Sequence, residues 1–390
     1  MGARGSIATT VAYGLSGLAQ GLVEPIGLTT EKGPLARLEL CSYGDMLLGG
    51  HEISSGDLSA SAAELVRNGV LPADLLAACG TEAAALDARI RPGVLDVADL
   101  GNADLDPSVS SLGGASQREK VQRLGADITS FRETHQLKRV IVVYLASTEP
   151  WTDDSESWQD LTHFEAALDS GAELPASCLY AYAALKAGAP FINFTPNRGA
   201  SVPALAALAL KEGLPHCGRD GKTGETLLKT ALAPMFAARA LRVLSWQGYN
   251  MLGNRDGVAL SDPMRLESKV HSKDAPLHAI LDDESLHTSV GIDYVPSLHD
   301  WKTAMDYVHF QGFLGAKMSL QFTWTGSDSA LAAPLVIDLI RLTDLAARLG
   351  EKGDMAHTAC FFKAPNGGGT HDFHKQFSQL LEYAEAHLKA

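Results

Sequence analysis

The first half of the chain alternates short apolar runs with longer segments of helical pattern. Residues 140–145 (VIVVYL) form a continuous run rich in β-branched residues, which is typical of a strand buried on both faces. Residues 191–194 (FINF) form a second such run, after an alanine-rich segment, 176–187, that predicts a helix ending at Gly188. Pro203 stands where the next helix is expected to begin, since proline suits a first helical turn. This alternation predicts a parallel sheet with helices on both faces.

Two other segments of this half also have a helical composition. Residues 57–86 are rich in alanine and leucine, with expected breaks near 69–72 and at Gly80. Residues 117–136 predict an amphipathic helix that leads into the strand at 140–145.

The pattern changes after about residue 226. Longer and more mixed strands are predicted at 241–246, 289–295, 304–313 and 317–324. Several of them are only a few residues apart, which indicates an open antiparallel or mixed sheet. Helical pattern then returns at 328–349 and at 373–389. A second structural unit is therefore expected to begin near residue 227.

Composition and charge narrow the class of protein. Of 390 residues, 46% are hydrophobic and 20% are charged, as in an ordinary globular protein. No apolar run approaches the about 20 residues that span a bilayer, and no secretory signal is evident. The net charge of −14 argues against nucleic acid and anionic membranes as partners. The five cysteines are scattered without a CxxC pair, which predicts reduced thiols in a cytoplasmic protein.

The N-terminus begins with a glycine-containing loop, residues 2–6, that precedes a helical pattern. Glycines let the backbone approach a pyrophosphate, and free amides at a helix N-terminus attract it. An ordinary turn before a helix could have the same sequence. Residues 1–6 also fit the myristoylation pattern MGxxxS, which we consider the weaker interpretation. A dinucleotide loop normally follows a strand, so we expect a first strand upstream of residue 1, or a substitute for it. We expect the ribose-binding acid at the end of a strand within 23–31.

A second anion site is predicted at residues 220–226 (DGKTGET). Glycine, lysine, threonine and an acid fall within this one short stretch, which is expected to be a turn leading into a helix. Thr223 is a natural N-cap for that helix, with free amides behind it. Residues 146–149 (ASTE), directly after the strand at 140–145, lie where a parallel sheet presents ligand-binding residues.

Four lysines stand out by their context. Lys269 and Lys273 are four residues apart and would share a helical face, Lys302 follows a predicted strand end, and Lys363 follows an apolar run. Most such lysines are simply solvated. Gathered in one pocket, however, they would lower each other's pKa, so that one acts as a base while the others hold a phosphate and a developing oxyanion. Acids that could orient them, or could equally cap turns and helices, are Asp220, Asp256 and Asp328.

In their order and spacing, these motifs resemble the myo-inositol-1-phosphate synthase family, in its shorter bacterial and archaeal form. The matching segments are residues 2–6, 49–53, 146–150, 179–186, 193–196, 220–226, 249–257, 267–274, 302–310, 332–334 and 361–365. The resemblance implies an α/β fold in which a Rossmann-type NAD-binding domain, 1–226, is completed by the C-terminal segment, 331–390. The resemblance also implies an inserted α+β catalytic and tetramerisation domain, 227–330, and a homotetramer.

The resemblance also implies the reaction. NAD would oxidise C5 of glucose 6-phosphate, an enolate would close the ring onto C1, and the hydride would return to C5 to give 1D-myo-inositol 3-phosphate. Lys269 would lie by the C5 hydroxyl, Lys273 and Lys302 by the phosphate and oxyanions, and Lys363 by the C1 oxygen. Asp256 and Asp328 would orient lysines. The residues implied in NAD binding are Gly2, Ala3, Arg4, Gly5, Ser6, Ala146, Ser147, Thr148, Asn193, Thr195, Asp220, Lys222 and Thr223.

Three other functions remain compatible with the sequence. They are a related NAD-dependent cyclase that acts on another sugar phosphate, a non-catalytic NAD-binding paralogue, and a simple dehydrogenase that would release NADH. The use of a monovalent or divalent cation stays open, because no His/Cys cluster dictates a metal site and only carboxylates such as Asp220, Asp256 or Asp328 offer ligands.

Overall fold

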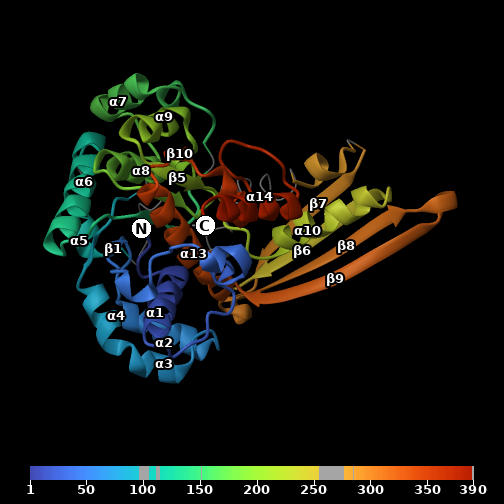
Figure 1. The fold of residues 1–390 in the computed structure, drawn as a ribbon, viewed down its shortest axis with the longest axis horizontal. Helices are drawn as coiled ribbons and strands as arrows, with labels where there is room; N and C mark the ends of the chain where they lie inside the picture. The colour runs from blue at the N-terminus through green and yellow to red at the C-terminus, as the bar shows by residue number, and fades with distance from the viewer. Residues whose placement is uncertain (96–104, 111–114, 151, 254–275, 284, 389–390) are drawn as a thin grey trace.

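Two four-stranded sheets organise the part of the chain that the structure, a computed structural model, describes (Figure 1). It describes residues 1–95, 105–110, 115–150, 152–253, 276–283 and 285–388. The first sheet is parallel, in the order β10-β5-β4-β3. Its strands are β3 (Val142–Tyr144), β4 (Phe191–Asn193), β5 (Pro215–Gly218) and β10 (Gly353–Asp354). This parallel sheet agrees with the predicted Rossmann-type α/β class.

Helices cover both faces of the parallel sheet, as the apolar pattern predicts. The bounds in the first 226 residues are α1 (Ser6–Ala19), α2 (Leu58–Arg67), α3 (Ala73–Ala78), α4 (Gly80–Asp87), α5 (Pro107–Ser110), α6 (Gln117–Thr134), α7 (Leu161–Ser170), α8 (Ala176–Lys186), α9 (Pro203–Glu212) and the start of α10 (Glu225–Ala238). The C-terminal part adds α13 (Asp328–Arg348) and α14 (Phe373–Ala386).

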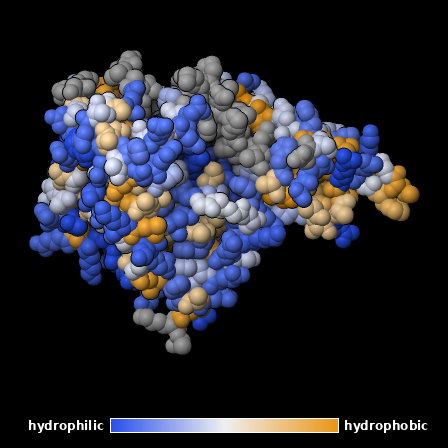
Figure 2. Space-filling view, turned by 90° about the horizontal axis from the view of Figure 1, so that it is seen from above, coloured by the Kyte–Doolittle hydropathy of each residue, from blue (hydrophilic) through white to orange (hydrophobic). Residues whose placement is uncertain are grey.

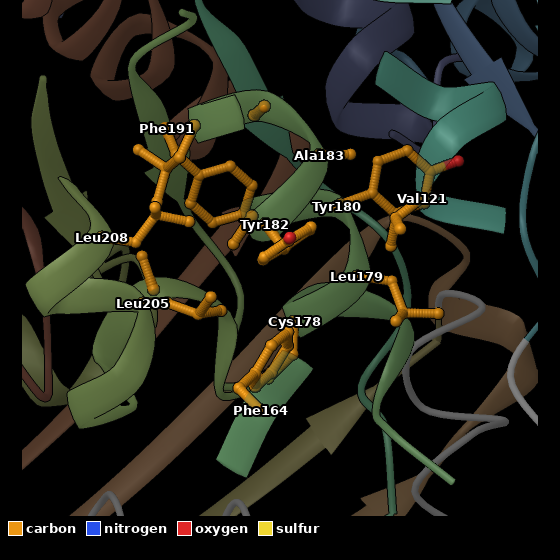
Figure 3. Close-up of a cluster of buried hydrophobic side chains, with 14 of the residues drawn as sticks. Val121, Phe164, Cys178, Leu179, Tyr180, Tyr182, Ala183, Phe191, Leu205 and Leu208 are labelled. Carbon is orange, nitrogen blue, oxygen red and sulfur yellow. The ribbon is translucent and has the colours of Figure 1, made fainter. Parts of the chain in front are cut away.

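Neighbouring residues of β4 enter different cores, which explains why its sequence is continuously apolar. Phe191 packs into a cluster formed by α6, α7, α8 and α9, where Leu205 and Leu208 of α9 lie beside it (Figure 3). Ile192, the next residue, packs on the opposite face with α1, α13 and α14. Burying each such side chain contributes about 1.5–3 kcal/mol. The C-terminal helices therefore complete the core of the N-terminal sheet.

The first residues of the chain lie between this sheet and a two-stranded parallel sheet of β1 (Gly50–Glu52) and β2 (Ile90–Pro92). The Met1 ammonium donates to Val143 O at 2.9 Å, and Leu145 N donates to Met1 O at 3.0 Å. On the other side, Gly2 N donates to His51 O at 3.1 Å. Residues 1 and 2 thus connect the end of β3 to β1.

Most of the predicted helices are confirmed. The segment 57–86 divides into α2, α3 and α4 at the expected breaks, and Pro203 is the first residue of α9. The strand expected within 23–31 is wrong. That segment is irregular and ends in a 3-10 turn, Thr29–Glu31, whose Thr29 and Thr30 amides bond to the Asp338 carboxylate of α13. In this segment, hydrogen bonds to a side chain of α13 take the place of the backbone hydrogen bonds that a strand would form.

The second sheet projects from the body as a long mixed layer (Figure 1). Its order is β7-β6-β8-β9, with β7 parallel to β6 and the other neighbours antiparallel. The strands are β6 (Arg242–Leu252), β7 (His287–Tyr294), β8 (Trp301–Gln311) and β9 (Lys317–Ser327). The prediction of a mixed or antiparallel sheet is confirmed, and each of its four strands is longer than predicted. One face is covered by α10, where Phe236 meets Trp246 and Val308.

Candidate functional site

The glycine loop lies at the carboxyl end of β3 and leads into α1. A Cβ on Gly2 would lie 2.9 Å from Leu145 O, so only glycine lets the loop approach the strand this closely. Gly5 is the N-cap of α1 and no described side chain caps the helix. The first-turn amides and the positive end of the helix dipole are therefore available to an anion, as a dinucleotide pyrophosphate requires. The residues present fit the NAD group that the sequence predicts.

The side chain of Arg4 has a structural partner in this loop. Its guanidinium donates from Nε to Asp87 Oδ1 at 2.9 Å and from Nη2 to Asp87 Oδ2 at 3.3 Å. The Arg4 backbone amide donates to Glu52 Oε2 at 2.8 Å. The contacts of Arg4 with Asp87 and Glu52 therefore mainly fix the conformation of the glycine loop.

Glu52 is a candidate cofactor residue that the sequence analysis missed. It ends β1 next to the glycine loop and is 7% exposed. An acid at the end of a neighbouring strand is where a Rossmann-type site holds the ribose hydroxyls. The signal in the sequence was the acid within Gly49-Gly-His-Glu-Ile53, but only the pairing of Gly2 with His51 puts that acid beside the loop.

The other predicted cofactor residues gather at the carboxyl edge of the parallel sheet. Ala146, Ser147 and Thr148 follow β3, Asn193 ends β4, and Asp220 comes two residues after β5. Asn193 Oδ1 accepts from Thr195 Oγ1 at 2.7 Å, and Thr195 O accepts from Asp220 N at 2.9 Å. Asn197, which the sequence analysis did not single out, connects this edge to Ser147 O through its Nδ2 at 3.0 Å. The edge is thus one hydrogen-bonded surface.

Two lysine–carboxylate pairs lie on either end of the turn 220–223. Lys363 Nζ donates to Asp220 Oδ1 at 2.7 Å, and Lys302 Nζ forms an ion pair with Asp328 Oδ1. Lys302 Nζ also donates to Thr223 Oγ1 at 2.9 Å. The four side chains of the ion pairs are 5–20% exposed. The turn therefore brings together a lysine from the second sheet and a lysine from the C-terminal segment.

The structure corrects two local predictions at this turn. Thr223 is not the N-cap of α10, because Gly224 holds that position and no described side chain caps the helix. The Thr223 hydroxyl instead donates to Asp328 Oδ1 at 3.0 Å and accepts from Lys302. Lys302 does not follow a strand end but is the second residue of β8. A Cβ on Gly224 would lie 3.1 Å from Lys302 Cε, so the glycine makes room for that lysine.

Lys222, in the middle of the turn, has a different environment from the other lysines. It is 3% exposed, and burial lowers its pKa to about 8, with a smaller contribution from the charge of Lys363. Its Nζ donates to Gln376 Oε1 of α14 at 2.6 Å. The sequence predicted a lowered pKa for one of the four other lysines and did not nominate Lys222 for this property.

Three predicted catalytic residues, Asp256, Lys269 and Lys273, lie outside the described residues. Within the part of the chain that the structure describes, no group of three or more His, Cys, Asp or Glu side chains could hold a metal ion. The same part contains no helix that is long and apolar enough to cross a membrane.

Comparison with known proteins agrees with the resemblance seen in the motifs. Residues 1–385 match the profile of an NAD-binding family described as myo-inositol-1-phosphate synthase. Inositol-3-phosphate synthase 1 of Bacteroides thetaiotaomicron is 32% identical over 96% of this chain and 90% of that protein. Inositol-3-phosphate synthase 1 of Oryza sativa subsp. japonica is 32% identical over 80% of this chain, which spans only 62% of the rice protein.

A solved structure supports the same relationship. The inositol-3-phosphate synthase of Caenorhabditis elegans superposes with a TM-score of 0.87 and 25% identity, covering 99% of this chain and 84% of the nematode chain. The predicted family, NAD-binding fold and enzyme class are thereby confirmed. The chain belongs to the myo-inositol-1-phosphate synthase family.

Proposed function

We propose that this protein is an inositol-3-phosphate synthase, which converts D-glucose 6-phosphate to 1D-myo-inositol 3-phosphate with NAD. The observation that carries the proposal is the turn 220–223, which joins the cofactor edge of the parallel sheet to two lysine–carboxylate pairs, Lys363–Asp220 and Lys302–Asp328. A dehydrogenase needs one base beside its nicotinamide. Several ammonium groups at one turn suit a substrate with a phosphate dianion and a reaction that develops oxyanions.

The chain's own residues would divide the work as follows. NAD, when bound, supplies reversible hydride transfer at C5 of the sugar. Lys302, oriented by Thr223 and Asp328, offers N–H donors to the phosphate or to an oxyanion. Lys363, oriented by Asp220, offers the same to the C1 oxygen during ring closure. The roles of Lys269, Lys273 and Asp256 rest on the family resemblance alone.

The test is to incubate purified protein with glucose 6-phosphate and NAD, to assay inositol phosphate by periodate-released phosphate, and to follow NADH absorbance. Product without net NADH is the expected result, because the hydride returns to its origin. Accumulating NADH without product would refute the synthase and favour a dehydrogenase. NAD binding without either signal would favour a non-catalytic paralogue, and turnover of another sugar phosphate alone would favour the related cyclase.

We further propose that residues 227–330 form a catalytic and tetramerisation domain inserted between two parts of the NAD-binding domain, 1–226 and 331–390, and that the protein is a homotetramer. The face of the second sheet opposite α10 exposes a row of large side chains: Tyr249, Met305 and Tyr307 are 40–46% exposed. Beyond them, Phe313 and Leu314 at the β8–β9 tip are 88% and 90% exposed, and Figure 2 shows hydrophobic residues at the far end of the projection. Large exposed apolar and aromatic side chains gathered on one element are found at protein interfaces.

A further inference from the structure

Lys222 carries a buried ammonium group for which the described part of the chain provides no carboxylate. Its contacts are the hydrogen bond to Gln376 Oε1 and the ring of Phe373, whose centre lies 5.8 Å from Nζ. A buried cation without a counter-charge is costly, so an apolar side chain would be the more stable choice at a position that served packing alone. The cost indicates that the lysine has a function.

The partner of Lys222 connects it to the C-terminal segment. Gln376 is fully buried in α14, and its Nε2 donates to Thr370 O at 2.7 Å. One glutamine therefore holds the Lys222 side chain through one end of its amide and the loop before α14 through the other. This chain of hydrogen bonds connects the turn 220–223 to Thr370, in the loop before α14.

The backbone on either side of Lys222 carries the partners of both described site lysines. Asp220 binds Lys363, and Thr223 binds Lys302. The Lys222 amide itself donates to Phe361 O at 2.8 Å, and Lys363 N donates to Asp220 O at 2.7 Å. A shift of Lys222 would therefore move the partners of both lysines together.

We propose that Lys222 is a positioning residue and not an NAD ligand. Through Gln376 it fastens α14 and residues 366–372 to the turn, and so it sets the places of Lys302 and Lys363. This inference rests on the proposed function, since it assigns a role within the same site.

The experiment compares Lys222→Met, Gln376→Leu and the double variant. Lys375→Met is the control, because Lys375 lies next to Gln376 on α14 and its side chain is 73% exposed. Each protein is measured for NAD affinity, for inositol phosphate formation, and for hydrogen exchange of the amides in 220–224 and 361–364. We expect each single change to lower kcat about 10- to 100-fold, the effect of misplacing reacting groups. The double variant should lose no more than the worse single variant, since both single changes break the same Lys222–Gln376 hydrogen bond.

The affinity for NAD distinguishes a positioning role of Lys222 from a role as an NAD ligand. We expect the Kd for NAD to stay within about threefold in all variants, while exchange in both segments accelerates in Lys222→Met and Gln376→Leu but not in Lys375→Met. Gln376→Glu keeps an acceptor for Lys222 and loses the Nε2 donor to Thr370 O, so its protection of 220–224 and its turnover should exceed those of Gln376→Leu. A tenfold weaker NAD affinity in Lys222→Met alone, or additive losses in the double variant, would overturn the proposal. If the wild type makes no product, the proposed function fails by itself, and exchange and NAD affinity still decide the role of Lys222.

Discussion

At the scale of single residues, the site depends on ammonium groups whose partners come from distant parts of the chain. We predict that Lys363→Ala lowers kcat/KM for glucose 6-phosphate by about 10²- to 10³-fold, the usual effect of removing one preorganised donor to a developing oxyanion. Lys302→Ala should have an effect of similar size. Periodate-released phosphate measures both, and Lys317→Ala at the exposed start of β9 is the control. Full activity of Lys363→Ala would refute its assignment.

A second residue-scale prediction concerns pH and stability. His216 on β5 is 2% exposed, and burial lowers its pKa to about 4 from the ordinary 6.5. Because the folded pKa lies below the unfolded one, protonation favours unfolding, and the contribution of this neutral histidine is lost as pH falls from about 6.5 toward 4. At pH 5 the loss is about 2 kcal/mol.

Urea unfolding at pH 8 and pH 5 tests this value. His216→Gln removes the titrating group, so the free energy of unfolding should fall by about 2 kcal/mol less in the variant than in the wild type. Other groups titrate equally in both proteins and cancel in the difference. Equal losses would mean that His216 is not buried in the neutral form.

The sequence could nominate the lysines of the site but not their partners. Lys363 and Asp220 are 143 residues apart, and nothing local connects them. Lys302 and Asp328 are closer, yet they meet because β8 and β9 are antiparallel and bring residue 302 opposite residue 326. Such pairings depend on strand register, which residue type does not reveal. The family resemblance supplied the roles that spacing alone could not.

At the scale of elements, the turn 220–223 is fitted against a neighbouring strand end so closely that it tolerates no side chain at Gly221. A Cβ there would lie 2.2 Å from Phe194 Cζ, and the Phe194 ring is buried. We predict that Gly221→Ala destabilises the protein by about 1–3 kcal/mol through overpacking and lowers activity by displacing Asp220 and Thr223. Thermal unfolding and turnover measure the two effects.

The control for this prediction is Gly44→Ala. Gly44 is exposed, and apart from its own chain neighbours no described atom lies within 4 Å of the Cβ it would gain, so stability and activity should be unchanged. If Gly221→Ala behaves like Gly44→Ala, the turn has room to move, and its close fit does not set the site geometry.

Elements differed in how far the sequence could define them. The helices of 57–86 and of 203–212 were found because glycine and proline mark their ends and alanine and leucine mark their faces. The strand predicted at 140–145 is longer than the one in the structure, because β3 pairs with β4 over only three residues. Thr223 fits the sequence preference for an N-cap. In the structure its hydroxyl instead forms hydrogen bonds with Lys302 and Asp328, which are distant in the sequence. The local capping preference thus gave the wrong prediction at the candidate site, because residues distant in the sequence compete for the same hydroxyl group.

At the scale of the whole molecule, the body and the projecting sheet have different surfaces. The body buries its apolar residues between the parallel sheet and helices from both ends of the chain. The projecting sheet packs one face on α10 and leaves the other face open, with alternate residues of β8 such as Met305 and Tyr307 exposed beside buried Asp306 and Val308. The sequence indicated the sheet, but its alternation could not show which of the two faces packs on α10.

The β8–β9 tip provides the most direct test of assembly. Phe313 and Leu314 together are almost fully exposed, and a monomer gains nothing from two large apolar side chains at the end of a long hairpin. If the tip packs against another copy, Phe313→Ser with Leu314→Ser should shift the protein from the tetramer toward smaller species in sedimentation equilibrium, without loss of thermal stability in the body. Ile26→Ser, which changes an 80% exposed residue on the body, should leave the mass unchanged. A tetramer unaffected by the tip variant would restrict the interface to the open face of the sheet, whereas a wild-type monomer would refute the tetramer itself.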